Sequence, residues 1–320
     1  MKIVILIAAL FALSIDMAAA AGLERIVVRS PIANSGTLEG AVWYPCAETP
    51  KIVKFRGVEL AGVPDCDVAG TSLPLIVISH GARGWFGGHH DTAAALADAG
   101  YVVAAITHPD KGRSWQTNRP AEIKGLIDYM LEGWGARSRL DADRIGFFGF
   151  SRGAYTGLVS IGGVPKFRKL ILHCLFAWSD PMCKSPDESG SSDEPVVKVD
   201  GFTHDPRIKA AVIAAPIGMV FSGDGLSEIT APVQLWRAER DELLIHPNHA
   251  EVVYEALPAK PEYHVVPKAG HFAFLAPCND VQFAAAKFIC EDAPGFDRVQ
   301  FHADMNAQIA RFFDLRLDPQ

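Results

Sequence analysis

One serine of the chain stands where a nucleophile is expected. Ser151 lies in the sequence G-F-S-R-G at 149–153, directly after the apolar run 144–150 and directly before a helical stretch. A serine in G-x-S-x-G at a strand-to-helix junction sits on a sharp turn that projects its hydroxyl above the edge of a sheet. The two glycines allow neighbouring chain to come close. Such a residue attacks a polarised carbonyl.

A nucleophilic serine needs a base, because a free hydroxyl is barely ionised at neutral pH. Among the 11 histidines, His271 alone combines a preceding glycine, a place after the last strand and the order serine, acid, histidine. The base in turn needs a carboxylate that fixes its tautomer and stabilises the imidazolium. We expect this acid to be Asp241, in the turn after the strand 232–238, with Asp224 and Glu239 as alternatives.

Two backbone N–H groups must stabilise the oxyanion that develops during such an attack. One belongs to the residue after the nucleophile, Arg152. The other is expected from the sequence S-H-G-A-R-G at 79–84, here called the oxyanion loop, which takes the place of the HGGG-type motif. Ala82 is the expected donor in this loop. A glycine turn without catalytic meaning is the alternative.

Two further residues are candidates to line the substrate pocket. Trp85 follows the oxyanion loop, and His108 ends the strand 101–107. The alternatives are plain packing for Trp85 and surface exposure for His108. The sequences H-H-D at 89–91 and H-P-D at 108–110 lack the i, i+4 spacing of a helical zinc pair. We therefore expect no metal and no organic cofactor.

Short apolar runs alternate with helical patterns through the chain, which indicates an α/β fold. The runs are nearly continuous in apolar residues, as in parallel strands covered on both faces. We expect eight strands in a mostly parallel sheet with helices on both faces, the first two strands being antiparallel. The runs lie at 24–30, 38–44, 73–79, 101–107, 144–150, 208–216, 232–238 and 262–267. Helices are expected at about 89–99, 120–133, 152–162, 248–257, 280–289 and 297–313.

Residues 163–207, here called the cap segment, interrupt this alternation. They begin with an apolar and basic sequence and end with a polar one. Connections of this length inside a compact domain are usually functional lids or mobile excursions. We expect a cap or lid inserted into the domain, and a surface insertion without function is the alternative.

The length permits two domains or one large α/β domain, and the alternation of strands and helices decides for one. The chain has 320 residues, of which 49% are hydrophobic and 21% charged, and these fractions exclude a disordered protein or a coiled coil. The formal net charge of −7 offers no basic field for nucleic acid. We therefore expect no nucleic-acid partner and a single domain at 22–320.

The first residues have the features of a secretory signal peptide. Lys2 precedes an apolar run at 3–15, and the small residues at 18–22 offer cleavage sites, so we expect a signal peptide at 1–21. The run is shorter than the roughly 20 residues that span a bilayer. Export to the periplasm or beyond the cell follows, with no integral membrane span after cleavage. A retained N-terminal anchor is the alternative.

Six cysteines form an even set, which in an exported chain indicates disulfides. They can pair in many ways. We favour pairing between sequence neighbours, because it closes three short loops. A zinc site is the alternative, but no C-x-x-C spacing occurs. The expected pairs are Cys46 with Cys66, Cys174 with Cys183, and Cys278 with Cys290.

The order of these motifs resembles the α/β-hydrolase superfamily. The resemblance rests on the oxyanion loop, the G-x-S-x-G sequence, Asp241 and His271, and it covers most of residues 38–290. It implies the α/β-hydrolase fold and serine-dependent ester hydrolysis through a Ser-His-Asp triad.

Within that superfamily, two stretches are similar to the predicted dienelactone hydrolases related to platelet-activating-factor acetylhydrolase. They are SHGARGWFGGHHDTAAALADAGYVVAAITHPD at 79–110 and KAGHFAFLAPC at 268–278. Dienelactone hydrolase proper has a cysteine where this chain has Ser151, and the plasma acetylhydrolase takes its acid earlier than Asp241. The resemblance therefore implies ester hydrolysis without naming either substrate.

The expected activity is hydrolysis of a small-molecule or lipid-like carboxylic ester through an acyl-enzyme. Two other functions remain open at this stage. The same nucleophile could cleave amides or polyesters. The fold could also have lost catalysis and kept only binding, with the cap segment as the recognition arm, although every part of the catalytic set is present in the sequence.

Overall fold

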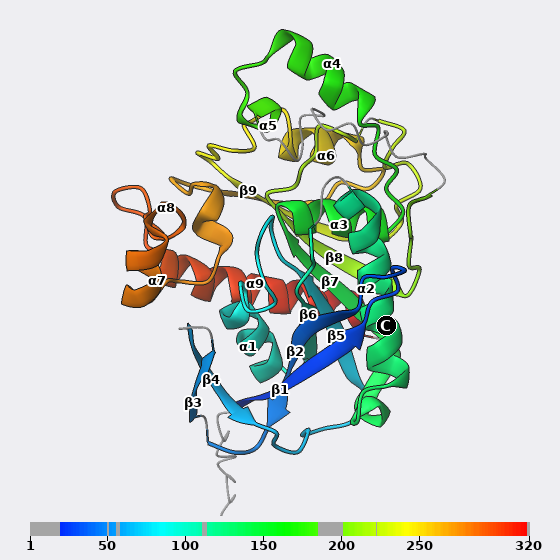
Figure 1. Ribbon diagram of the computed structural model, residues 1–320, viewed down its shortest axis with the longest axis vertical. Helices are drawn as coiled ribbons and strands as arrows, with labels where there is room; N and C mark the ends of the chain where they lie inside the picture. Colours follow the sequence, from blue (N-terminus) through cyan, green and yellow to red (C-terminus); the bar gives the residue numbers. More distant parts are fainter. Residues whose placement is uncertain are drawn as a thin grey trace, which may run out of the picture.

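The computed structural model describes residues 20–49, 51–55, 58–110, 114–184, 201–221 and 223–318 (Figure 1). Its strands are β1 (Ala20–Arg29), β2 (Thr37–Cys46), β3 (Lys51–Phe55), β4 (Val58–Pro64), β5 (Leu73–Ser79), β6 (Val102–Ile106), β7 (Leu140–Phe150), β8 (Ile208–Ala214), β9 (Val233–Ala238) and β10 (Glu262–Val266). Its α-helices are α1 (His90–Asp98), α2 (Trp115–Glu132), α3 (Arg152–Ser160), α4 (Arg168–Phe176), α5 (Pro181–Lys184), α6 (Ala250–Ala256), α7 (Asp280–Ala285), α8 (Lys287–Cys290) and α9 (Arg298–Leu317). The short 3-10 helices η2 (Arg137–Arg139) and η4 (His271–Phe274) complete the set.

The strands form one sheet in the order β10-β9-β8-β7-β5-β6-β2-β1-β4-β3. Six consecutive strands of this sheet are parallel to one another, namely β10, β9, β8, β7, β5 and β6. β2 is antiparallel to both β6 and β1, as expected for the first pair. Because the carboxyl ends of the parallel strands meet at one edge, the loops after β5, β7, β9 and β10 come together there.

Both faces of the sheet are covered by helices (Figure 1). In β5, Leu75 and Val77 pack into one apolar cluster and Ile76 and Ile78 into the other, as the two-residue period of a strand requires. The first cluster includes residues of α2 and α3, and the second includes residues of α1 and α9. These two layers confirm the α/β fold expected from the apolar runs.

The expected count of eight strands is wrong, because the described part of the chain has ten. The additional strands are β3 and β4, an antiparallel pair at the edge of the sheet. Residues of β3 are exposed or only half-buried. An edge strand of this kind lacks the continuous apolar run by which the buried strands were found.

Two helices also differ from expectation. α2 begins at Trp115, five residues before Pro120, where the start was expected. Pro120 has no N–H to bond the carbonyl of Gln116, and that carbonyl instead accepts the hydroxyl of Tyr155 from α3 at 3.3 Å. The single helix expected at 280–289 is divided into α7 and α8 by a break at Ala286.

All three predicted disulfides are present: Cys46–Cys66, Cys174–Cys183 and Cys278–Cys290. Of the predicted signal peptide, residues 1–19 lie outside the described residues, and Ala20 and Ala21 pair with β2. Within the ranges given above, no helix has both the length and the apolar character needed to cross a bilayer.

The cap segment is described at 163–184 and 201–207. It carries α4 and α5, which lie at the top of Figure 1, away from α1 and the β3–β4 pair. Leu170 and Met182 face inward and are buried. The Cys174–Cys183 disulfide joins the two helices. This part of the chain therefore packs onto the domain through a small apolar contact.

Candidate active site

Ser151 occupies the turn between β7 and α3 in a strained conformation, with φ 56° and ψ −116°. A positive φ is costly for a non-glycine residue and persists where the surrounding structure enforces it. The space around the two flanking glycines shows how tightly the surrounding structure holds this turn. A Cβ on Gly149 would lie 2.4 Å from the carbonyl oxygen of Gly153, and one on Gly153 would lie 1.9 Å from that of Ser79. Both positions require glycine, because β5, β7 and α3 meet at this point.

Three side chains from three loops form one hydrogen-bonded chain. The Oγ atom of Ser151 lies 3.0 Å from Nε2 of His271, and Nδ1 of His271 lies 2.8 Å from Oδ2 of Asp241. Ser151 follows β7, Asp241 follows β9 and His271 follows β10. The imidazole can therefore accept the serine proton at Nε2 while Asp241 holds the proton on Nδ1.

Asp241 is an ionised, buried carboxylate. Burial by itself would raise the pKa of Asp241, but the charge and hydrogen bond of His271 and the N–H groups of Leu243 and Leu244 outweigh it. The pKa therefore lies below its ordinary value. The two N–H groups donate to Oδ1 at 3.0 and 2.7 Å, which leaves Oδ2 aimed at the imidazole.

The alternative acids are engaged elsewhere. Glu239 accepts the backbone N–H of Lys268 at 2.8 Å, and Asp224 is paired with Lys166. Glu242, which the sequence did not single out, accepts the backbone N–H of His271 at 2.9 Å. The His271 loop is thus held by Glu242 and its ring by Asp241.

The oxyanion loop packs closely against Ser151. A Cβ on Gly81 would lie 3.0 Å from the ring of Phe150 and 3.6 Å from Cβ of Ser151, so only glycine lets the loop approach this closely without displacing its neighbours. A cavity of about 180 Å³ opens over Ser151 and His271. Its walls include both expected oxyanion donors and apolar side chains: Ala82, Arg152, Pro181, Met182, Ile217, Leu243 and Leu244.

Neither expected pocket residue is among those lining this cavity. Trp85 packs against Phe55 and Phe86, with ring centroids 5.4 and 5.0 Å away. The His108 side chain is fully buried, so it lies neither at a pocket mouth nor on the surface. Its ring lies 2.6 Å from Glu122 and 3.0 Å from the Ser79 hydroxyl, below the loop. Its hydrogen bonds with Ser79 of β5 and Glu122 of α2 compensate for the burial of its ring.

The pair of His302 and Asp91 fixes the loop that carries His271. His302 of α9 donates from Nε2 to the carbonyl of Ala273 at 2.8 Å and contacts Oδ2 of Asp91 at 2.5 Å through Nδ1. Burial would raise the pKa of Asp91, but the hydrogen bond and charge of His302 outweigh it and lower the pKa from 3.8 to about 2.

This shift predicts acid sensitivity. A carboxyl whose pKa is depressed in the folded state stabilises it above its unfolded pKa, and that contribution is lost as the pH falls from about 4 to about 2. Asp91→Asn is therefore expected to lower the free energy of unfolding by about 2 kcal/mol at pH 5 and by much less near pH 2. Urea unfolding of both proteins at the two pH values measures this. An equal difference at both values would contradict it.

The chain resembles a solved structure over nearly its whole length. No protein-family model and no curated protein matches it. The structure of a ferulic acid esterase from Streptomyces cinnamoneus matches 94% of this chain and 91% of its own, with a TM-score of 0.62 and 20% sequence identity. The two proteins share a fold, and the α/β-hydrolase fold expected from the sequence is confirmed.

Proposed function

We propose that the protein is a serine hydrolase that cleaves carboxylic esters through an acyl-enzyme. The observation that carries the proposal is the continuous chain from Ser151 through His271 to Asp241, opening on a cavity that Ala82 and Arg152 also line. The fold shared with a ferulic acid esterase supports it.

Each step follows from this geometry. Nε2 of His271 takes the proton of the Ser151 hydroxyl as its oxygen attacks the ester carbonyl. The N–H groups of Ala82 and Arg152 hold the oxyanion that forms. His271 then protonates the leaving alcohol, and water activated by the same imidazole releases the acid. No step needs a metal or an organic cofactor.

We also propose the compartment in which the protein acts and the class of its substrate. The three disulfides fit an oxidising compartment such as the periplasm or the cell exterior. A signal peptide at 1–21 would take the chain there. We propose a small-molecule or lipid-like ester as substrate, and membership of the predicted dienelactone hydrolases related to platelet-activating-factor acetylhydrolase.

The experiment that tests the function is turnover of p-nitrophenyl esters, from acetyl to long acyl chains, by the oxidised protein. A feruloyl ester belongs in the series because of the structural neighbour. Matched amides separate esterase from amidase action. A folded protein that turns over none of these esters, yet binds one, would favour the binding-only alternative.

Met182 is the residue through which we expect the cap segment to set acyl size. It is 5% exposed and lines the cavity over Ser151. Its backbone N–H donates to the carboxylate of Asp180 at 3.0 Å. The neighbouring Cys183 is fixed by its disulfide. Met182→Ala enlarges the cavity, so we expect the chain-length optimum to move to longer acyl groups and kcat/KM for acetyl esters to fall about tenfold.

The ester series measures this shift directly. Leu175→Ala is the matched control, since Leu175 lies on α4 in the same segment but is 67% exposed and does not line the cavity. An unchanged optimum in Met182→Ala, or the same shift in both variants, would contradict a role for Met182 in setting acyl size.

A further inference from the structure

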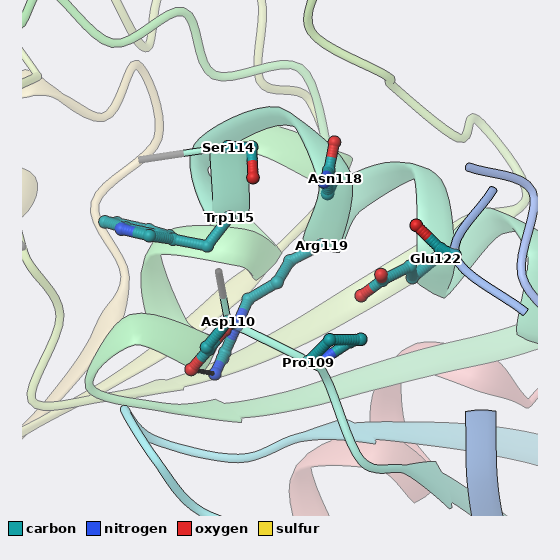
Figure 2. A pocket seen from close by; sticks show the side chains of 8 residues that line it. Pro109, Asp110, Ser114, Trp115, Asn118, Arg119 and Glu122 are labelled. Atoms are coloured by element: carbon teal, nitrogen blue, oxygen red, sulfur yellow. Dashed lines mark hydrogen bonds and ion pairs between the residues drawn. The ribbon is translucent and has the colours of Figure 1, made fainter. Parts of the chain in front are cut away.

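A buried arginine holds the back of the oxyanion loop. Arg119 of α2 is 1% exposed, and Figure 2 shows its side chain reaching from the helix to Asp110. Its Nη1 donates to the carbonyl oxygen of His80 at 2.6 Å, and its Nη2 donates to that of Gly81 at 3.1 Å. One guanidinium therefore fixes the two carbonyls that directly precede Ala82.

The direction of the Ala82 N–H follows from this contact. The carbonyl of Gly81 and the N–H of Ala82 belong to one peptide group, and in a planar trans peptide they point in opposite directions. Among the described residues the only cis peptide is elsewhere, at His246–Pro247. Holding the Gly81 oxygen toward Arg119 therefore turns the Ala82 N–H away from Arg119. Hydrogen bonds to the carbonyl also polarise the same peptide and strengthen its N–H as a donor.

His80 is the second group that holds this carbonyl. Its Nε2 accepts the backbone N–H of His108 at 3.0 Å, so the ring proton is on Nδ1, which donates to the Gly81 oxygen at 2.6 Å. Burial first, and then the charge of Arg119, lower the pKa of His80 well below its ordinary value. The ring is therefore a neutral, fixed donor.

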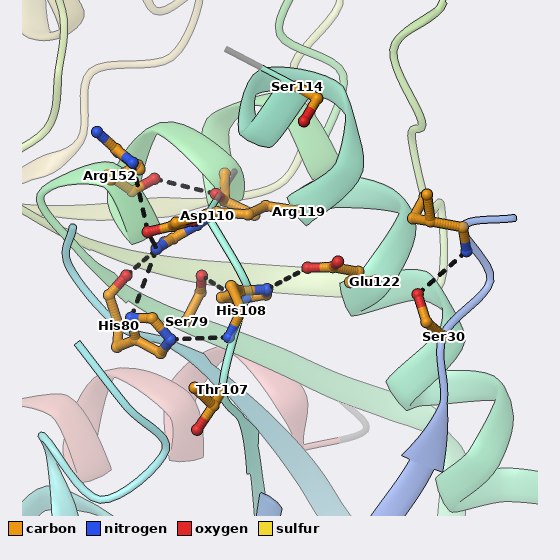
Figure 3. Close-up of polar contacts among 12 residues, drawn as sticks. Ser30, Ser79, His80, Thr107, His108, Asp110, Ser114, Arg119, Glu122 and Arg152 are labelled. Carbon is orange, nitrogen blue, oxygen red and sulfur yellow. Dashed lines mark hydrogen bonds and ion pairs between the residues drawn. The ribbon is translucent and has the colours of Figure 1, made fainter. Parts of the chain in front are cut away.

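Asp110 connects the two halves of the oxyanion site. Its carboxylate accepts Nε and Nη2 of Arg119, each at 2.6 Å, and the backbone N–H of Arg83 at 3.3 Å. It also lies 3.3 Å from Nη1 of Arg152, the residue whose N–H is the other expected donor (Figure 3). The peptide after Ala82, the Arg119 guanidinium and the side chain of Arg152 thus meet at one carboxylate. The peptide before Ala82 is linked to it through Arg119.

The surroundings keep Asp110 ionised. Burial would raise the pKa of Asp110, but the hydrogen bonds and charge of Arg119 and the charge of Arg152 outweigh it and lower the pKa. The guanidinium of Arg152 also stacks on Trp115, 4.3 Å from the ring centroid. The guanidinium of Arg119 makes two bonds to the carboxylate and one to each of the two carbonyls, and a lysine ammonium has too few N–H donors to make all four.

We propose that Arg119 and Asp110 are positioning residues that aim the two N–H groups of the oxyanion hole, Ala82 directly and Arg152 through its side chain. This inference rests on the proposed ester hydrolysis. Neither residue lines the cavity over Ser151. Their effect is on kcat, because the oxyanion exists in the transition state and not in the bound ester.

The test compares Arg119→Lys, Arg119→Met and Asp110→Asn with the unmodified protein. Active sites are counted by titration with a p-nitrophenyl phosphonate, so that kcat refers to reactive protein only. We expect kcat to fall about 10²- to 10³-fold in Arg119→Met and about tenfold or more in the other two, with KM changed less than about threefold. A cavity of about 140 Å³ adjoins Arg119, so water can hydrate a shorter side chain there.

A spectroscopic readout separates positioning from stability. The infrared carbonyl band of a trapped acyl-enzyme moves to lower frequency as oxyanion hydrogen bonds strengthen. We expect it to move to higher frequency in each variant. Arg298→Lys is the matched control, because Arg298 of α9 is also buried and binds Asp292 and the carbonyl of Ile289. Its kcat and band are expected to stay unchanged.

Two results would overturn the inference. The first is a kcat per titrated site within about threefold of the unmodified protein in both Arg119→Lys and Asp110→Asn, whatever their melting temperatures. The second is an unshifted carbonyl band in variants whose kcat has fallen. An unmodified protein that is folded but neither reacts with the phosphonate nor hydrolyses any ester would instead overturn the proposed function, and the inference with it.

Discussion

Replacing Ser151 by alanine is expected to lower kcat for ester hydrolysis by about 10⁴- to 10⁶-fold. In the proposed mechanism the Ser151 hydroxyl is the only part of the triad that forms a bond to the substrate, and no other described hydroxyl is bonded to His271. The residual rate comes from binding and the oxyanion hole, which the substitution leaves in place. Initial rates with a p-nitrophenyl ester, measured on purified oxidised protein, give this number.

Ser160→Ala is the matched control for this variant. Ser160 is a buried serine at the end of α3, the helix that begins directly after Ser151, and its hydroxyl has no hydrogen-bond partner among the described residues. Its removal is expected to leave kcat within about twofold. Full esterase activity in Ser151→Ala would overturn the serine mechanism, and equal losses in both variants would point to damage of α3.

Asp241→Asn is expected to lower kcat by about 10⁴-fold, and the lowered pKa of Asp241 also predicts a smaller free energy of unfolding at neutral pH. An asparagine oxygen can still accept the N–H groups of Leu243 and Leu244, so the turn is kept. Its amide cannot accept the Nδ1 proton in the same way, and the imidazole is then free to adopt the wrong tautomer. The loss comes from orientation and from the missing charge beside the imidazolium.

The alternative acids provide the controls for Asp241. Glu239→Gln and Asp224→Asn remove one carboxylate each, but these groups bond Lys268 and Lys166 rather than His271. Their kcat values are expected to stay within about threefold of the unmodified protein. A large loss in either, with activity retained in Asp241→Asn, would reassign the acid. Circular dichroism of all three variants confirms that the fold is intact.

The structure brings together the same three side chains that the sequence singled out as nucleophile, base and acid. Their order and their places after strands are local properties, visible in 149–153 and around His271. The residues that line the pocket, by contrast, cannot be found from local sequence. Met182 and Leu243 line it, but nothing in their own neighbourhoods indicates that they meet, because they belong to the cap segment and to the loop after β9.

A signal for the buried contacts of Arg119 was present in the sequence. Arg119 and Glu122 lie on the face of α2 that also buries Ile123, Leu126 and Met130. Charged residues at helical spacing on an apolar face indicate buried partners. The pattern does not identify those partners, since Asp110 and the oxyanion loop reach this face only through the packing of α2 against β5 and β6.

What the sequence determined by itself is what depends on neighbours in the chain: the strand-turn-helix around Ser151, the alternating elements, and disulfides that close short loops. Tertiary structure alone decided the edge strands β3 and β4, the burial of His108 beside Glu122, and the meeting of Arg119 with the carbonyl of Gly81. The physical reason is that a turn or a buried strand is specified by local conformational preference and apolar period. The partner of a buried charge is fixed instead by which loops the finished sheet brings to one edge.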